Sequence, residues 1–228
     1  MIKTLALLRK ADSVSQDSFL ETWAHAARAQ LTDGVLRSVQ YHVQPPPPSP
    51  PGSPPLPLQV DGLEEVWFDS DKALAQFQAS ATRPAFGAVA AMTRVVFEEA
   101  TIADELPPGA TGDGMLKRLV VLIRKAGFSH EQFIRHWVDV HAPLAKRVQG
   151  GARKYCQLYV MRELANRADL PTLGVEIDGF SESWFDDAAH LGRSLDVPGG
   201  ADLARDNRIY VETSKLIFYK EIEIKAYG

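Results

Sequence analysis

Two histidines five positions apart are the side chains of this sequence best suited to move a proton. They lie in the segment HWVDVHAPLA, residues 136–145. An imidazole titrates near pH ~6.5, so a suitably placed histidine can act as a general acid or base at neutral pH. Each residue of an α-helix turns by about 100°. That turn places four side chains of this region on one apolar face, which we expect to be buried: Phe133, Trp137, His141 and Leu144.

His141 is therefore expected to point inward at the end of the helix. Pro143 lacks the N–H that would continue the helix, which favours a break near Ala142. His136 lies about 140° around the helix from His141, and we expect it to face solvent among polar neighbours. Two interpretations of His141 are open at this point. It is either a buried histidine bonded to a backbone carbonyl or the proton-transferring group of a site.

Candidate partners lie on strand segments, in which alternate side chains share a face. The segment YCQLYVM, 155–161, places three polar side chains together: Tyr155, Gln157 and Tyr159. The matching set in SVQYHVQ, 38–44, is Ser38, Gln40 and His42. The same alternation places Glu65 on one strand face with Trp67, and Glu182 on one strand face with Trp184. We expect each half to combine these residues on one sheet face, as a polar network between sheets or as a pocket with aromatic walls.

An internal repeat organises the chain. Residues 1–23 (MIKTLALLRKADSVSQDSFLETW) align without a gap to residues 115–137 (MLKRLVVLIRKAGFSHEQFIRHW), 114 positions later. Further on, DGLEEVWFDS at 61–70 matches DGFSESWFDD at 178–187, 117 positions later. Two matches in the same order indicate a duplication. The segment DELPPGATGDG between them has the composition of a linker. We expect repeat 1 at 1–104, a linker at 105–114 and repeat 2 at 115–228.

Both repeats have the same predicted order of elements. A strand rich in leucine and valine (2–9 and 116–123) precedes a helix, which begins at Ser15 in repeat 1 and at Ser129 in repeat 2. Gln132 completes a capping box with Ser129. Two strands, a short helical region and a last strand follow; the middle strands are expected at 37–44, 62–68, 154–161 and 179–185.

This order is the ferredoxin-like βαββαβ motif. One such sheet has helices on one face only, so its other face needs a cover. We therefore expect an α+β fold, in which two ferredoxin-like units fused in one chain bring their antiparallel sheets face to face. The sheets would form a barrel with the helices outside.

Composition and charge limit the class of protein. The chain has 228 residues, 45% of them hydrophobic and 24% charged, with a formal net charge of -4 and one cysteine, Cys156. This balance gives no reason to expect nucleic acid or an anionic membrane as a partner. One cysteine excludes an internal disulfide and a cysteine-rich zinc cluster. No apolar run approaches the ~20 residues of a membrane helix, and we expect a cytoplasmic location.

The proline-rich segment 45–58 separates the middle strands of repeat 1. Proline fixes φ and favours the polyproline II conformation. We expect a stiff surface loop that lies over a cavity mouth, and a ligand for a proline-recognition module is the alternative.

Both repeats resemble the EthD family. In repeat 2 the resemblance rests on FSHEQFIRHWVDVHAPLAKRV, YCQLYV and DGFSESWFDD, and in repeat 1 on YHV and DGLEEVWFDS. It implies an α+β barrel of the dimeric kind, here fused in one chain. It also implies relatives in polyketide and aromatic pathways that are cofactor-free dehydratases, decarboxylases, isomerases or lyases. On that pattern His141 is the acid or base. Repeat 1 departs from it, since Ala27 stands at the position of His141, although His42 could serve there.

The residues and the resemblance together predict a cofactor-independent lyase or isomerase, dehydratase-like or decarboxylase-like, for a small apolar or aromatic oxygenated metabolite. The expected catalytic side chains are His141, Tyr159 and Glu182. The expected substrate-binding side chains are Trp137, Gln157, Tyr155, Trp184, His42, Gln40 and Glu65. No cofactor and no metal are expected, and a further homodimer is left open. Two alternatives are a non-catalytic binding protein that serves a monooxygenase and a haem-binding barrel with an axial histidine.

Overall fold

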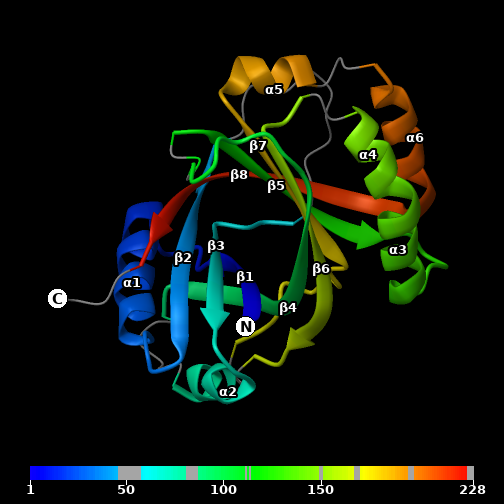
Figure 1. Cartoon of the computed structure of the whole chain (residues 1–228). Coiled ribbons are helices and arrows are strands. Elements are labelled where there is room, and N and C mark those ends of the chain that lie inside the picture. The colour runs from blue at the N-terminus through cyan, green and yellow to red at the C-terminus, as the bar shows by residue number, and fades with distance from the viewer. Residues whose placement is uncertain are drawn as a thin grey trace.

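Eight antiparallel strands close into a barrel in this computed structural model, in the order β1-β3-β2-β8-β5-β7-β6-β4 (Figure 1). The structure describes residues 1–45, 58–80, 87–110, 112, 114–148, 151–166, 170–194 and 198–224. Most of the proline-rich segment, residues 46–57, lies outside the described residues, so the predicted surface loop stays a prediction.

The two halves of the chain contribute the same series of strands. The first half contains β1 (Ile2–Lys10), α1 (Gln16–Ala29), β2 (Val35–Gln44), β3 (Gly62–Phe68), α2 (Asp71–Ser80) and β4 (Val89–Asp104). The second half contains β5 (Leu116–Arg124), α3 (His130–His136), η2 (Trp137–His141), α4 (Ala142–Val148), β6 (Lys154–Leu164), β7 (Gly179–Phe185), α5 (Ala188–Ser194), α6 (Gly200–Tyr210) and β8 (Val211–Glu223).

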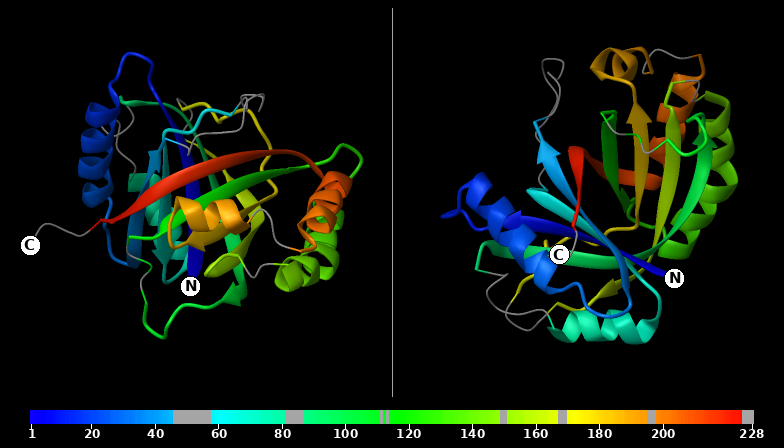
Figure 2. Two further views of the ribbon diagram at one scale, coloured as in Figure 1. Left: turned by 90° about the horizontal axis from the view of Figure 1, so that it is seen from above. Right: turned by 60° about the vertical axis from the view of Figure 1, so that its left-hand side comes forward.

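The halves meet along two seams, where β2 pairs with β8 and β4 pairs with β6. Between the seams the strand order is β4-β1-β3-β2 in the first half and β8-β5-β7-β6 in the second, so equivalent strands occupy equivalent places. The helices lie outside the barrel (Figure 2). This confirms the predicted α+β fold of two facing ferredoxin-like units. The residue boundaries of the repeats stay a prediction.

Alternation along the strands fills the barrel interior with apolar side chains. They include Leu5, Leu7, Val39, Leu63, Val95, Leu119, Val121, Leu158 and Phe180. The opposite face of the sheet packs against the helices, through Phe19 and Trp23 of α1 and through Phe133 of α3. Strand residues therefore alternate between the barrel interior and the outer face, which the helices partly cover, and a shift of one residue would exchange the two sets.

A tryptophan lies on a glycine in each half. The Trp23 ring of α1 covers Gly62, and the Trp137 ring covers Gly179. A Cβ atom added at Gly62 would lie 2.5 Å from the Trp23 ring, and one added at Gly179 would lie 2.3 Å from the Trp137 ring. No side chain fits under either ring, so only glycine allows this approach. The repeated Asp-Gly of the sequence thus marks the point where each major helix meets the sheet.

The first helix of each repeat is capped as predicted. Ser15 accepts a hydrogen bond from the backbone of Ser18 at the start of α1. Ser129 and Gln132 form the complete capping box at the start of α3, which satisfies two backbone N–H groups reciprocally. The sequence therefore predicted both helix starts correctly.

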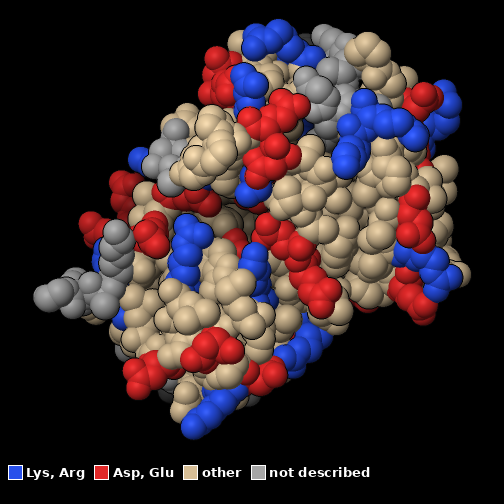
Figure 3. Space-filling model, viewed as in Figure 1, with Lys and Arg blue, Asp and Glu red and all other residues tan. Residues whose placement is uncertain are grey.

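The surface carries charges of both signs. Acidic and basic side chains are interspersed on the face shown in Figure 3. Among the described residues, no helix is both long enough and apolar enough to cross a membrane.

Candidate functional site

A π-helical turn interrupts the long helix of the second half. The backbone N–H of Ala142 donates to the carbonyl of Trp137, five residues earlier, and α4 continues from Ala142. Pro143 is the second residue of α4, where its missing N–H fits beside a turn that already breaks the regular bonding. The predicted irregularity near Ala142 is therefore present, but the prediction that the helix ends there is wrong. His141 lies within the helix.

The π turn brings both histidines to one carboxylate. His136 Nε2 lies 2.8 Å from Oδ1 of Asp206, and His141 Nδ1 lies 2.8 Å from Oδ2 of the same residue. Residues five apart stack above each other in a π turn, whereas the regular helix assumed from the sequence separates them by about 140°. The prediction that His136 faces solvent is therefore wrong, since its side chain is only 18% exposed and bound to Asp206.

His141 is neutral and fixed in one tautomer. Burial lowers its pKa, against the hydrogen bond and the charge of Asp206, which raise it; the neighbouring His136 lowers it further. A carboxylate only accepts hydrogen bonds, so the ring proton of His141 lies on Nδ1 and leaves Nε2 unprotonated. His141 is buried as the sequence predicted, with 5% of its surface exposed.

Asp206 comes from α6, a helix that the sequence analysis did not separate from the short helical region before the last strand. Tyr210 of the same helix packs its ring 4.6 Å from the His136 ring and 5.6 Å from the His141 ring. Asp206 and Tyr210 are both buried. Their spacing of four, with Leu203 three residues before Asp206, was the available signal, because it marks one inward face that contains a carboxylate.

An open groove of about 370 Å³ runs along the outside of this cluster. Its walls are Gly127, Phe128, Gln132, Arg135, His136, Asp139 and Val140. His136 therefore joins the groove to the buried Asp206, while His141 lies behind it. A small molecule in the groove would meet apolar walls, an amide and a guanidinium close to an imidazole.

Tyr155, Gln157 and Tyr159 share one face of β6, as predicted, and this face packs against the helix layer. Tyr159 donates to the Gln157 side chain at 2.7 Å, and Gln157 donates to the Tyr155 hydroxyl at 3.2 Å. The Tyr159 ring packs edge-on against Trp137 at 5.2 Å. Burial raises the pKa of Tyr159 to about 12. These side chains form a hydrogen-bonded chain beneath the helix that carries His141.

The predicted partners Glu182 and Trp184 lie on the opposite face of the sheet. Cys156 pairs with Glu182 across β6 and β7, whereas Gln157 pairs with Ser181. Glu182 accepts a hydrogen bond from Tyr219 in the barrel interior. The prediction of one face combining Gln157 and Tyr159 with Glu182 and Trp184 is wrong. The sequence predicted correctly which side chains share a face within each strand. Only the register between neighbouring strands decides whether those faces lie on the same side of the sheet.

The first half repeats this separation. Glu65 lies in the barrel interior and accepts a hydrogen bond from Tyr41, whereas Gln40 and His42 face the helix α1. Burial raises the pKa of Glu65 to about 8, and the nearby charge of Glu182 contributes to this rise, whereas the hydrogen bond from Tyr41 lowers the pKa. His42 Nε2 lies 3.3 Å from Gln40 Oε1, and burial followed by the charge of Lys220 lowers the pKa of His42.

A third histidine of the second half is occupied on both ring nitrogens. His130 bonds Asp178 through Nδ1 and the Val160 carbonyl through Nε2, each at 2.8 Å. It therefore ties α3 to the sheet. Within the described part of the chain, no three His, Cys, Asp or Glu side chains are arranged to hold a metal ion.

Comparisons with known proteins agree with this architecture. The model of the EthD domain matches residues 125–214. An anthrone oxidase-like protein superposes with a TM-score of 0.66 at 15% identity, over 100% of this chain and 96% of the other. A proposed monooxygenase from Lactobacillus acidophilus NCFM superposes with a TM-score of 0.52 at 11% identity, over 98% of this chain and 95% of the other. A chlorite dismutase variant from Candidatus Nitrospira defluvii superposes with a TM-score of 0.51 at 12% identity, over 96% of this chain and 90% of the other.

These superpositions establish a shared fold, and the low sequence identities leave the activity open. No curated protein sequence matches the chain. The family match covers the repeat in which the sequence resemblance was clearer and includes both histidines and Asp206. Residues 125–214 match the EthD domain model, within a chain that folds as a closed α+β barrel.

Proposed function

We propose that the second half of the chain is a cofactor-independent acid–base catalyst, a lyase or isomerase that moves a proton on a small, largely apolar oxygenated molecule. One observation carries the proposal: Asp206 binds a different histidine with each of its carboxylate oxygens, at 2.8 Å in both cases. A carboxylate that orients an imidazole and stabilises its protonated form is the usual support of a histidine general base.

His136 is the group that meets the substrate in this proposal, because it lines the groove. Its Nε2–H donates to Asp206, which leaves Nδ1 free to accept a proton from a carbon or hydroxyl next to a carbonyl group. The resulting imidazolium lies against the Asp206 carboxylate, which stabilises its charge. The proton then returns to another position of the substrate or to the leaving group.

His141 acts as a positioning residue, although the sequence alone pointed to it as the base. It is almost fully buried and holds the second oxygen of Asp206, so the carboxylate cannot turn away from His136. Phe128 and Val140 supply apolar walls for the substrate, and Arg135 is placed to bind its oxygen. Glu182 lies across the sheet and takes no part in this step.

Proton exchange tests the proposal without knowledge of the natural substrate. Small aromatic ketones and β-hydroxy carbonyl compounds are incubated with the pure protein in D2O, without additives, and loss of the proton next to the carbonyl is followed by NMR. His136→Gln and Asp206→Asn should each slow the exchange about 10²-fold or more. His141→Gln should slow it less, and His25→Gln on the exposed face of α1 should have no effect.

The variants separate the alternatives. If His141→Gln abolishes exchange while His136→Gln retains it, His141 is the base, as the sequence suggested. If the wild-type protein exchanges none of the probes, or all variants exchange at its rate, the acid–base proposal fails and a binding function is favoured.

A further inference from the structure

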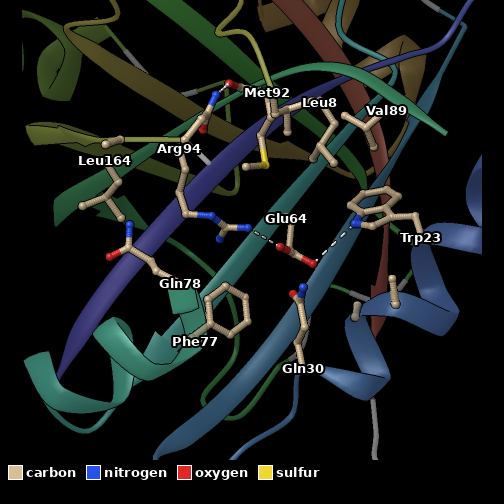
Figure 4. Close-up of a pocket in the computed structure, with 15 residues that line it drawn as sticks. Leu8, Trp23, Gln30, Glu64, Phe77, Gln78, Val89, Met92, Arg94 and Leu164 are labelled. Carbon is tan, nitrogen blue, oxygen red and sulfur yellow. Dashed lines mark hydrogen bonds and ion pairs between the residues drawn. The ribbon is translucent and has the colours of Figure 1, made fainter. Parts of the chain in front are cut away.

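A partly open cavity lies beside the helices of the first half, at the place where the second half carries its histidine cluster, and Leu164 and Leu170 of the second half complete its wall. It lies between α1, α2 and the sheet (Figure 4). Most of its wall is apolar: Leu8, Trp23, Ala26, Ala27, Phe77, Val89, Met92, Leu164 and Leu170. Its volume is about 60 Å³, whereas one buried water needs only ~10–15 Å³. A small ring or short chain therefore matches the space better than a single water.

Ala27 is the reason that this space is open. It occupies the position of His141 in the aligned repeats and lines the cavity. In the second half, the imidazole of His141 and the α6 side chains Asp206 and Tyr210 fill the equivalent region. The first half thus has room in place of a base, which points to binding and not to proton transfer.

The charged groups of the cavity neutralise each other. Arg94 forms an ion pair with Glu64, and both side chains are at least nine-tenths buried. Arg94 also donates to Thr4 at 3.1 Å, and Trp23 Nε1 donates to Glu64 at 3.4 Å. A charged ligand would find no free counter-charge here and would lose its hydration, so the cavity favours a neutral molecule.

The Gln30 amide is a polar group of the cavity wall that a ligand can reach. The Gln30 side chain is 8% exposed and extends from α1 toward the Glu64–Arg94 pair in Figure 4. No side chain or backbone group among the described residues makes a hydrogen bond with its amide, which has two donor hydrogens and an acceptor oxygen. Both polar atoms of this amide keep some contact with solvent, and a ligand hydroxyl could replace water there by accepting a hydrogen bond from the amide and donating one to it.

We infer that this cavity binds a small, neutral, mainly apolar molecule with one hydroxyl group, whose oxygen pairs with Gln30 while its apolar part contacts Met92, Val89 and Leu170. The site is separate from the proposed catalytic cluster and goes beyond the proposed function. Phenol is the simplest probe with this chemistry. Toluene has nearly the same shape without the hydroxyl, and benzoate adds a negative charge.

The indole N–H resonance of Trp23 reports binding directly, because Trp23 lines the cavity. In NMR titrations of the full chain, phenol should shift this resonance saturably. Toluene should bind about tenfold more weakly, because it leaves the Gln30 amide unpaired. Benzoate should bind at least about 100-fold more weakly, because its charge has no free partner.

Two variants and one matched control complete the test. Ala27→Leu should fill the cavity and abolish the phenol shift, whereas Ala29→Leu, on an exposed site of the same helix, should bind phenol as the wild type does. Gln30→Leu keeps the approximate side-chain size and should bring the affinities for phenol and toluene within about twofold of each other. This variant tests the inference even if Ala27→Leu fails to fold.

The inference is overturned if phenol shifts Trp23 equally in Ala27→Leu, if benzoate binds as tightly as phenol, or if Gln30→Leu keeps the preference for phenol. The readout is binding, so absence of proton exchange in the second half would leave this result unaffected.

Discussion

Two buried carboxylates, Asp206 and Glu65, lie on opposite sides of the sheet and have different environments. Asp206 lies in the helix layer and accepts two imidazole N–H groups, whereas Glu65 lies among the aliphatic side chains of the barrel interior with one tyrosine partner. Hydrogen bonds from several donors favour a charged carboxylate, and burial among apolar groups favours the protonated form. The surroundings of Glu65 therefore favour its protonated form.

Glu65 gives a prediction on stability. Its pKa is raised from 4.5 to about 8, so between these pH values the unfolded chain is ionised while the folded protein keeps the proton. The folded state binds more protons, and the free energy of unfolding should fall as pH rises, by at most about 1.4 kcal/mol per pH unit. Glu65→Gln stays neutral, so its stability relative to wild type should increase from pH 5 to pH 8.

Urea unfolding at the two pH values measures this difference. Glu98→Gln, on an exposed position of β4, is the matched control and should show no such trend. A constant difference between Glu65→Gln and wild type would mean that Glu65 is ionised in the folded protein.

Tyr159 gives a second prediction at this scale. Its hydroxyl donates to Gln157, which is fully buried, so Tyr159→Phe leaves the Gln157 oxygen without a partner. We expect a loss of about 1 kcal/mol in the free energy of unfolding and an unchanged rate of proton exchange. Melting temperature and exchange rate are measured on the same sample. A large loss of exchange at full stability would instead place Tyr159 in the catalytic site.

At the scale of elements, the π turn η2 is what assembles the site. It inserts one residue into the bonding pattern of the helix, and His136 and His141 then share one side. The same turn accepts Pro143, whose backbone has no N–H to donate. Helix α6 completes the arrangement by presenting Asp206 and Tyr210 to this side.

Removing the extra residue tests the role of the π turn. Deletion of Val138, which is 40% exposed, together with Pro143→Ala should convert the segment into a continuous α-helix. His136 and His141 would then be four residues apart, about 40° around the helix, and would still share one face, so proton exchange should stay within about tenfold of the wild-type rate. The downfield NMR signal of the imidazole proton shared with Asp206 should also remain. Pro143→Ala alone is the control, and loss of both exchange and this signal in a folded double variant would contradict this account of the π turn.

At the scale of the molecule, fusion of two repeats lets one chain close its own barrel. The seams β2–β8 and β4–β6 each join one half to the other. A half on its own would expose the edge strands at these seams and one side of the apolar interior, and unpaired edges of this kind favour association.

Expression of the halves separately tests this consequence and the predicted repeat boundaries. We expect residues 115–228 alone to dimerise or aggregate in size-exclusion chromatography. Co-expression with residues 1–104 should give a soluble one-to-one complex that elutes like the full chain. A stable, folded monomer of residues 115–228 would show that the halves do not depend on each other.

The sequence by itself determined the repeat, its element order and the facing sheets. The middle strands 62–68 and 179–185 were predicted with the boundaries that the structure shows, and the Ser129 cap formed as expected. These features depend on local periodicity, capping chemistry and the need of an apolar sheet face for a cover. Burial of His141 followed from the same periodicity.

Only the tertiary structure decided which residues meet. Asp206 lies 65 positions from His141, and no local pattern specifies such a pairing. The π turn changed the phase of the helix, so a regular turn per residue misplaced His136. The register between strands placed Glu182 in the barrel and Tyr159 in the helix layer. The cavity in the first half exists because Ala27 is small where packing left no other side chain to fill the space.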